Sequence, residues 1–206
     1  MMDLTLEVLN VIGTLAFAVS GAVAAMEEEY DLLGVYVLSF VTAFGGGAVR
    51  NVLLGFPVFQ LWEQQKMFLI VFVLVSLFMF LPWLLAQTWF RWGYCFDAIG
   101  LAAFSTQGAI LANQAGHSFI AVIVAATLTG TGGGIIRDVL AGRKPLVFRD
   151  EIYALWAALA GLLIAFGWVK QPWMNYLLIA AIVILRMVSV HYRWRLPKPR
   201  LISPEK

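Results

Sequence analysis

The sequence predicts an all-α integral membrane protein with seven transmembrane helices, arranged as an inverted repeat of three plus three helices followed by a seventh. Three observations lead to this prediction. The 206 residues are 62% hydrophobic and only 13% charged, whereas a soluble domain has about 45–50% apolar and about 25% charged residues. Apolar segments long enough to cross a bilayer recur along the chain. Finally, the first half of the sequence resembles the second half in one ungapped register.

A bilayer-spanning helix needs about 20 mainly apolar residues, and seven segments approach or exceed this length. The connections between them are short, which indicates one compact bundle without a soluble domain. The predicted spans are residues 6–26, 32–55, 67–88, 94–113, 118–141, 151–169 and 173–191.

The distribution of lysine and arginine predicts the orientation, because cytoplasmic loops of membrane proteins are enriched in both. With the N-terminus outside, the outer loops hold only Lys66 and Lys170, and the inner loops and the tail hold most of the basic residues. We therefore expect the N-terminus outside and the C-terminus inside. Arg186 lies near the predicted inner end of the last span and is expected to reach the interface. The first ten residues contain two acids and no basic residue, so we expect no cleaved signal peptide.

The internal repeat relates position n to position n + 87. The same offset aligns residues 10–22 with 97–109 and Thr42 with Thr129, which is strong support for an ancient duplication. In this register Asn51 stands opposite Asp138. The matching motif residues are Gly45, Gly46, Gly47, Arg50, Val52, Leu53 and Gly55 in the first copy and Gly132, Gly133, Gly134, Arg137, Val139, Leu140 and Gly142 in the second.

Each copy contains three predicted spans, and an odd number makes the second copy enter the bilayer from the opposite side. We expect a first repeat over residues 1–90, an inverted repeat over 91–170, and a peripheral seventh helix with a basic tail over 171–206. Inverted repeats are typical of transport proteins, whose pathway lies near the midplane where the repeats meet.

The two glycine triplets have two interpretations that are compatible. Each glycine weakens a helix by about 1 kcal/mol relative to alanine, so the triplets could bend or unwind helices that border a water-filled pathway. Freed backbone oxygens could then meet a monovalent cation. Alternatively, the triplets let two helices pack closely. Neutral oxygen ligands are available nearby from Ser20, Thr42, Ser105, Thr106, Gln107, Thr129 and Thr131.

The two arginines inside the apolar segments must pair, reach the interface or face water. Inversion places Asp97 at a depth comparable to Arg137, so we predict that these two side chains are in contact. Asp138 follows Arg137 directly and is expected to point about 100° away around the helix. The equivalent pair in the first copy would be Asn10 with Arg50, which lacks a carboxylate.

These features resemble the prokaryotic TRIC family, homologues of the trimeric intracellular cation channels. The resemblance rests on the duplicated three-helix unit, the GGG-x-x-R-[ND] motif in spans two and five, and the seventh span, and it covers about residues 6–190. The bacterial family is also known as a glycine transporter domain. The resemblance implies a homotrimer in the bacterial inner membrane, with a potassium-permeable pore in each protomer that the second and fifth helices line. By motif, it implies pore and gate roles for Gly45, Gly46, Gly47, Arg50, Asn51, Gly132, Gly133, Gly134, Arg137 and Asp138.

The function that this pattern favours is therefore a passive channel for monovalent cations. The alternative is a secondary carrier for a small zwitterion such as glycine, because carriers use inverted repeats more often than channels do. An enzyme is not expected, because His117 and His191 lie without a nucleophile or a metal-ligand cluster around them. No cofactor is expected, and no basic face indicates a nucleic-acid partner.

Overall fold

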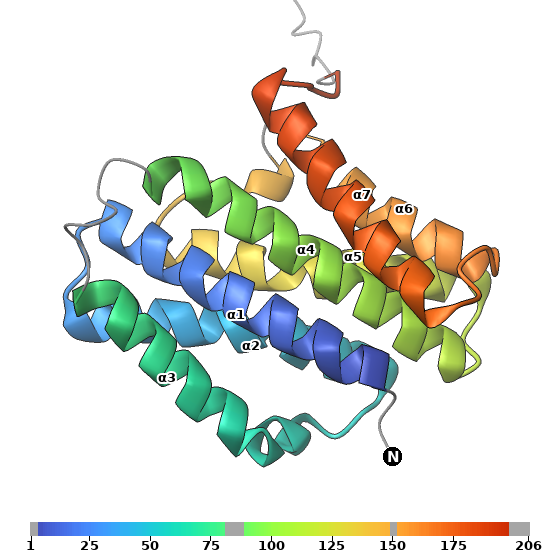
Figure 1. Cartoon of the computed structure of the whole chain (residues 1–206), viewed down its shortest axis with the longest axis horizontal. Helices are drawn as coiled ribbons and strands as arrows, with labels where there is room; N and C mark the ends of the chain where they lie inside the picture. Colours follow the sequence, from blue (N-terminus) through green and yellow to red (C-terminus); the bar gives the residue numbers. More distant parts are fainter. Residues whose placement is uncertain (1–3, 81–88, 149–151, 198–206) are drawn as a thin grey trace, which may run out of the picture.

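The computed structural model describes residues 4–80, 89–148 and 152–197, which form a bundle of seven α-helices (Figure 1). Two short 3₁₀ helices that the sequence did not indicate, η1 (Val58–Glu63) and η3 (Leu146–Phe148), follow α2 and α5. The α-helices are α1 (Leu4–Glu27), α2 (Leu32–Leu54), α3 (Gln65–Phe80), α4 (Trp89–Gln114), α5 (Phe119–Leu140), α6 (Ala154–Ala165) and α7 (Pro172–His191).

Five of these helices, α1, α2, α4, α5 and α7, are long and apolar enough to cross a membrane. Large apolar side chains such as Leu69, Phe80 and Leu177 are exposed on the outside of the bundle, as expected for a surface that faces lipid. The chain is therefore an all-helical, multi-pass membrane protein.

The two remaining helices are shorter than the predicted spans. The end of the third predicted span, residues 81–88, lies outside the described residues. The sixth span was predicted to reach residue 169, but α6 ends at Ala165. Gly167 there adopts a left-handed φ of 68°, and the chain turns before Pro172 begins α7. The 12 residues of α6 rise about 18 Å, against about 30 Å for the hydrocarbon core.

The ends of α2 and α5 are formed in the same way. The side chains of Asp31 and Ser118 cap the two N-termini, each accepting a hydrogen bond from the backbone N–H three residues later. Both helices stop before a glycine in the left-handed region, with φ 69° at Gly55 and 70° at Gly142, a conformation that costs glycine little. Each pair of capping residues is 87 positions apart, so the local structure follows the register of the sequence repeat.

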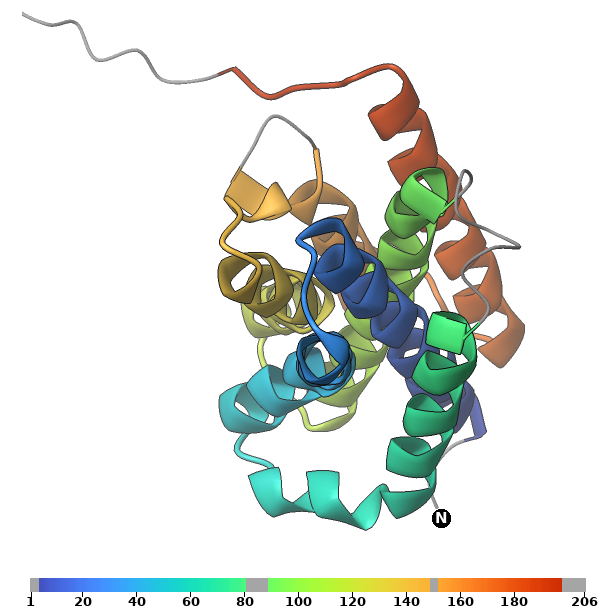
Figure 2. The ribbon, with the colours of Figure 1, turned by 90° about the vertical axis from the view of Figure 1, so that its left-hand side faces the viewer.

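Four helices form the centre of the bundle: α1 packs against α2 and α4, and α5 packs against α2 and α4. Seen along this core in Figure 2, α3 and α6 lie on opposite sides of it. The helix α3 covers α1 and α2, α6 covers α5 and α4, and α7 leans on α4 and α6. The helices that are equivalent in the repeat therefore pack against equivalent partners, although α6 contacts α5 much more extensively than α3 contacts α2.

The apolar core has two main parts. One joins α1, α2 and α3 around residues such as Leu38 and Val71, and the other joins α4 to α7 around Val122 and Ile182. The same helices also bury a set of polar and charged side chains that no soluble core of this size would need. Among them are Ser20, Thr42, Arg50, Asn51, Asp97, Ser105, Thr106, Gln107, Thr129, Thr131, Arg137 and Asp138.

Candidate functional site: a glycine crossing and two arginine centres

The glycine triplets form the closest approach between α2 and α5. A Cβ atom added to Gly46 would lie 2.6 Å from the backbone oxygen of Thr129, and one on Gly133 would lie 2.5 Å from that of Thr42. Only glycine fits at such distances, because the atoms in the way are backbone. Both helices continue without interruption through the triplets. The expectation that the triplets unwind the helices is therefore wrong, and the absence of side chains lets the two helices pack closely, as the second interpretation predicts.

A second symmetric contact joins α1 and α4. The ring of Phe104 covers Gly13 and the ring of Phe17 covers Gly100, so that neither glycine has room for a side chain. The two rings pack on each other with centroids 5.5 Å apart. As at the α2–α5 crossing, the contacts come in pairs whose members differ by 87 positions.

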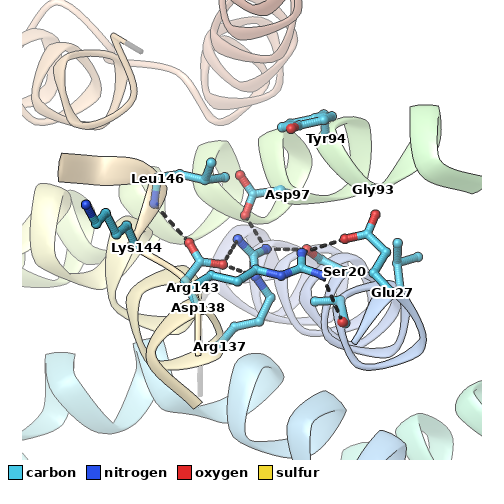
Figure 3. Close-up of a pocket in the computed structure, with 12 residues that line it drawn as sticks. Ser20, Glu27, Gly93, Tyr94, Asp97, Arg137, Asp138, Arg143, Lys144 and Leu146 are labelled. Atoms are coloured by element: carbon cyan, nitrogen blue, oxygen red, sulfur yellow. Dashed lines mark hydrogen bonds and ion pairs between the residues drawn. The ribbon is translucent and has the colours of Figure 1, made fainter. Parts of the chain in front are cut away.

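Arg137, on α5, lies in a cluster of buried acceptors that we call the Arg137 centre (Figure 3). Its NH1 atom donates to Oδ1 of Asp97 at 2.7 Å, which confirms the predicted contact. NH1 also donates to Oγ of Ser20 at 2.5 Å. Nε and NH2 both bind Oδ1 of Asp138, at 2.9 and 2.8 Å. The prediction that Asp138 points away is wrong, because the long arginine side chain folds back to reach its neighbour.

A second buried arginine lies behind this centre. The hydroxyl of Tyr153, at the start of α6, donates to Oδ1 of Asp97 at 3.2 Å. The guanidinium carbon of Arg186, on α7, lies 4.8 Å from the centroid of the Tyr153 ring. Arg186 is 0% exposed, so the expectation that it reaches the interface is wrong. The helix outside the repeat thus adds a positive charge to only one of the two arginine centres.

Arg50, on α2, occupies the equivalent Arg50 centre. Its NH1 atom donates to Oε1 of Gln107 at 2.7 Å, and its Nε and NH2 atoms donate to Oδ1 of Asn51 at 3.1 and 2.9 Å. The predicted contact with Asn10 is wrong, because Asn10 donates to Oε1 of Gln64 instead. The longer side chain of Gln107 reaches the guanidinium from α4.

The two centres have the same design with different charges. Ser20 and Gln107 are 87 positions apart, as are Asn51 and Asp138, and each accepts from the arginine of its own centre. Arg137 therefore has two carboxylates as partners, whereas Arg50 donates to neutral amides. Sequence reasoning named Ser20 and Gln107 only as possible cation ligands. Because Ser20 and Gln107 occupy equivalent positions in the two copies of the repeat, this equivalence could have identified both as hydrogen-bond acceptors for the arginines.

The other predicted oxygen ligands are partly used within their own helices. The hydroxyls of Thr42, Ser105 and Thr131 donate to backbone oxygens three or four residues earlier. The hydroxyls of Thr106 and Thr129 are buried and have no hydrogen-bond partner among the described residues. Thr129 and Thr42 also supply the backbone oxygens that face Gly46 and Gly133, so these two predicted ligands lie at the crossing itself.

A pocket of about 80 Å³, which we call the Arg137 pocket, opens beside the Arg137 centre (Figure 3). Asp97, Arg137 and Asp138 line it, and an ion pair between Arg143 and Glu27 lies at its rim. Although partial burial disfavours the charged guanidinium, the hydrogen bonds that Arg143 donates to Glu27 and Glu28 raise its pKa above the usual value.

The fold and the site together define a polytopic helical membrane protein with charged groups buried between symmetric helix pairs. The family model described as "Glycine transporter" matches the chain twice, over residues 7–83 and 94–170, and the second match begins 87 residues after the first. The chain belongs to this family.

Relatives and solved structures agree with this assignment. The chain is 56% identical to the UPF0126 membrane protein YvgT of Bacillus subtilis over 191 residues, 93% of this chain and 95% of that one. A prokaryotic TRIC channel crystallised in 0.5 M KCl is 34% identical, with a TM-score of 0.84 over 93% of this chain and 98% of that one. The TRIC orthologue from Rhodobacter sphaeroides is 32% identical, with a TM-score of 0.78 over 92% and 99%. The resemblance to the prokaryotic TRIC family is confirmed.

Proposed function

We propose that the chain forms a channel for monovalent cations, potassium among them, and that it has no enzymatic activity. The observation that carries this proposal is the match to solved TRIC channels over nearly the whole length of both chains at more than 30% identity. The names of these channels describe cation conduction and a trimer, and we extend both to this chain as a homotrimer with one pore in each protomer. Like the UPF0126 inner membrane protein YadS of Escherichia coli, it would lie in a bacterial inner membrane.

The proposed architecture is an inverted repeat of α1–α3 and α4–α6 followed by α7, with all seven helices in the bilayer. The repeats would comprise residues 1–90 and 91–170, and 171–206 would hold α7 and the basic tail. The paired contacts 87 positions apart and the double match of the family model support this arrangement. The distribution of basic residues supports an outer N-terminus and a cytoplasmic C-terminus.

The proposed pore runs beside the crossing of α2 and α5. The glycine triplets hold these helices together at the midplane, so an ion would pass along the crossing and meet the two arginine centres in turn. Asp97 and Asp138 neutralise Arg137, while Arg50 keeps its charge. We propose that both arginines are gate elements, with Asn51, Ser20 and Gln107 holding them in place, and that Thr42 and Thr129 mark the narrowest point.

Single-channel recording after reconstitution in a planar bilayer tests the channel function. We expect unitary steps of picoampere size in potassium chloride, which correspond to ion fluxes far above the turnover of any carrier. Saturable, gradient-coupled uptake without unitary steps would contradict the proposal.

Exchanging the neutral and acidic residues beside the two arginines is expected to change the unitary conductance in opposite directions. A fixed positive charge repels a cation by roughly 4 kcal/mol at 4 Å for an effective dielectric of 20. Asn51→Asp would place a carboxylate against Arg50 and is expected to raise the potassium conductance several-fold. Asp138→Asn, its matched partner in the repeat, is expected to lower it. Equal conductances in both variants would show that neither arginine lies along the ion path.

The alternative function is a carrier for a small zwitterion, which the family's description as a glycine transporter favours. Arg50, which donates to neutral amides, would then bind the substrate carboxylate. Uptake of labelled glycine into proteoliposomes, abolished by Arg50→Gln, would support the carrier and displace the channel.

A further inference from the structure

The Arg137 centre contains a carboxylate oxygen that its own hydrogen bonds leave unused. Asp97 is 1% exposed, and its Oδ1 atom accepts the hydrogen bonds from both Arg137 and Tyr153. Its Oδ2 atom is buried and has no hydrogen-bond partner among the described residues. A buried charged oxygen in this state is costly, so the position is suited to a ligand.

The geometry of the Arg137 centre explains why Arg137 does not bind the Oδ2 atom of Asp97. Arg137 could in principle bind both oxygens of one carboxylate, but its Nε and NH2 atoms already bind Asp138. Only NH1 reaches Asp97, and NH1 is shared with Ser20. Figure 3 shows the second oxygen of Asp97 turned away from the guanidinium, on a residue that lines the Arg137 pocket.

The charges around the pocket favour a cation. At its base, two carboxylates, those of Asp97 and Asp138, face the single guanidinium of Arg137. At its rim, the charges of Glu27 and Glu28 are balanced by the two basic residues Arg143 and Lys144, of which Arg143 pairs with both acids. Arg186 is a further positive charge, but the ring of Tyr153 separates it from the carboxylate.

The size and the ligands of the pocket favour a monovalent cation. The pocket's volume of about 80 Å³ exceeds the roughly 10–15 Å³ that one water needs on this measure, so it has room for one ion and coordinating water. Calcium takes six to eight oxygen ligands, commonly from several carboxylates. The described part of the chain contains no group of three or more His, Cys, Asp or Glu that could hold such a metal.

We propose that Oδ2 of Asp97 binds a monovalent cation of the potassium class in the Arg137 pocket, with water completing its coordination. The site rests on the proposed channel function, to which it adds a binding position at the Arg137 end of the ion path. Asp97 would thus have two roles, since one oxygen holds the arginine and the other holds the ion.

Thermal unfolding of the full-length protein in detergent tests the site without any need for conduction. Potassium chloride is compared with choline chloride at equal concentration. A ligand at ten times its Kd is expected to raise the Tm of a chain of this size by roughly 3 °C. Asp97→Asn, which keeps the Oδ1 contacts and replaces Oδ2 by a donor, is expected to lose this shift. Glu7→Gln, the control, removes an exposed negative charge of α1 that does not line the pocket, and it is expected to keep the shift.

Crystals of the wild-type protein grown in rubidium chloride give an independent measurement, which stands even if Asp97→Asn does not fold. An anomalous peak within coordination distance of Oδ2 is expected. A peak only at the glycine crossing, no peak at all, or an equal potassium shift in Asp97→Asn would overturn the site. Unitary currents without evidence of this site would support the channel function and overturn only the site. A potassium-dependent Tm shift without unitary currents would support the site and overturn the channel function.

Discussion

Replacing Arg137 by methionine is expected to lower the free energy of unfolding by about 3–5 kcal/mol, the usual range when one partner of a buried ion pair is removed. The change leaves Asp97 and Asp138 buried without their shared guanidinium. The same replacement at Arg50 is expected to reduce stability by only about 1–2 kcal/mol, because it leaves two neutral amide oxygens and no unpaired charge. Chemical unfolding of each variant in detergent, compared with the wild type, measures both values.

A rescue experiment identifies the physical cause of this difference. If unpaired carboxylates cause the loss, then Asp97→Asn and Asp138→Asn added to Arg137→Met should recover most of it. In the equivalent variant, Arg50→Met, the acceptors left behind are the amides of Gln107 and Asn51, so there is no acidic partner whose removal could restore stability. Equal losses for the two arginine variants, or no recovery on removing the acids, would show that packing rather than charge determines the stability of these centres.

The helices and the ion pair between Asp97 and Arg137 could be predicted from the sequence, because both depend on patterns that are visible in the sequence itself. Apolar length located the spans, and the repeat offset placed Asp97 opposite Arg137. The predicted contact between Asn10 and Arg50 was wrong, because the repeat offset does not determine which other side chains compete for each partner. Asn10 donates to Gln64, which lies just before α3, and Gln107 of α4 accepts the hydrogen bond from Arg50.

The glycine triplets show where a local rule gave the wrong answer. Helix propensity is measured in water, where an unwound segment can bond to solvent. Inside a bilayer every freed backbone group lacks a partner, so unwinding six residues would cost more than their low propensity does. The helices therefore stay intact, and the absence of side chains lets Gly46 meet the backbone of α5 and Gly133 that of α2.

The two halves of the chain differ in the charges that surround their buried arginines. One duplicated motif keeps Arg50 with neutral acceptors, and the other keeps Arg137 with two acids and a second arginine behind Tyr153. The close glycine contacts with backbone are paired in the two halves. Under the proposed channel function, we therefore expect conduction differences between the two ends to depend on a few side chains, and we expect exchanges at these positions to change ion passage without changing the fold.

Adding one methyl group at the centre of each glycine triplet is expected to be far more damaging than adding it one residue away. In Gly133→Ala the new Cβ would lie 2.5 Å from the Thr42 oxygen, and in Gly46→Ala it would lie 2.6 Å from the Thr129 oxygen. Backbone cannot yield locally, so α2 and α5 must separate. Overpacking of this kind usually reduces stability by about 1–3 kcal/mol, and the double variant is expected to lose about 4 kcal/mol or more.

The triplets themselves supply the matched controls. The nearest atom to a Cβ on Gly132 is a methyl of Val49 at 3.4 Å, and on Gly47 nothing lies closer than 3.8 Å. Alanine at these two positions is expected to be neutral or stabilising by up to about 1 kcal/mol, because it favours the helix. Chemical unfolding and unitary conductance are measured on all four single variants. If Gly132→Ala were as damaging as Gly133→Ala, backbone contact would not explain the triplets. If Gly133→Ala were stable but non-conducting, the crossing would act on the ion path directly rather than through helix packing.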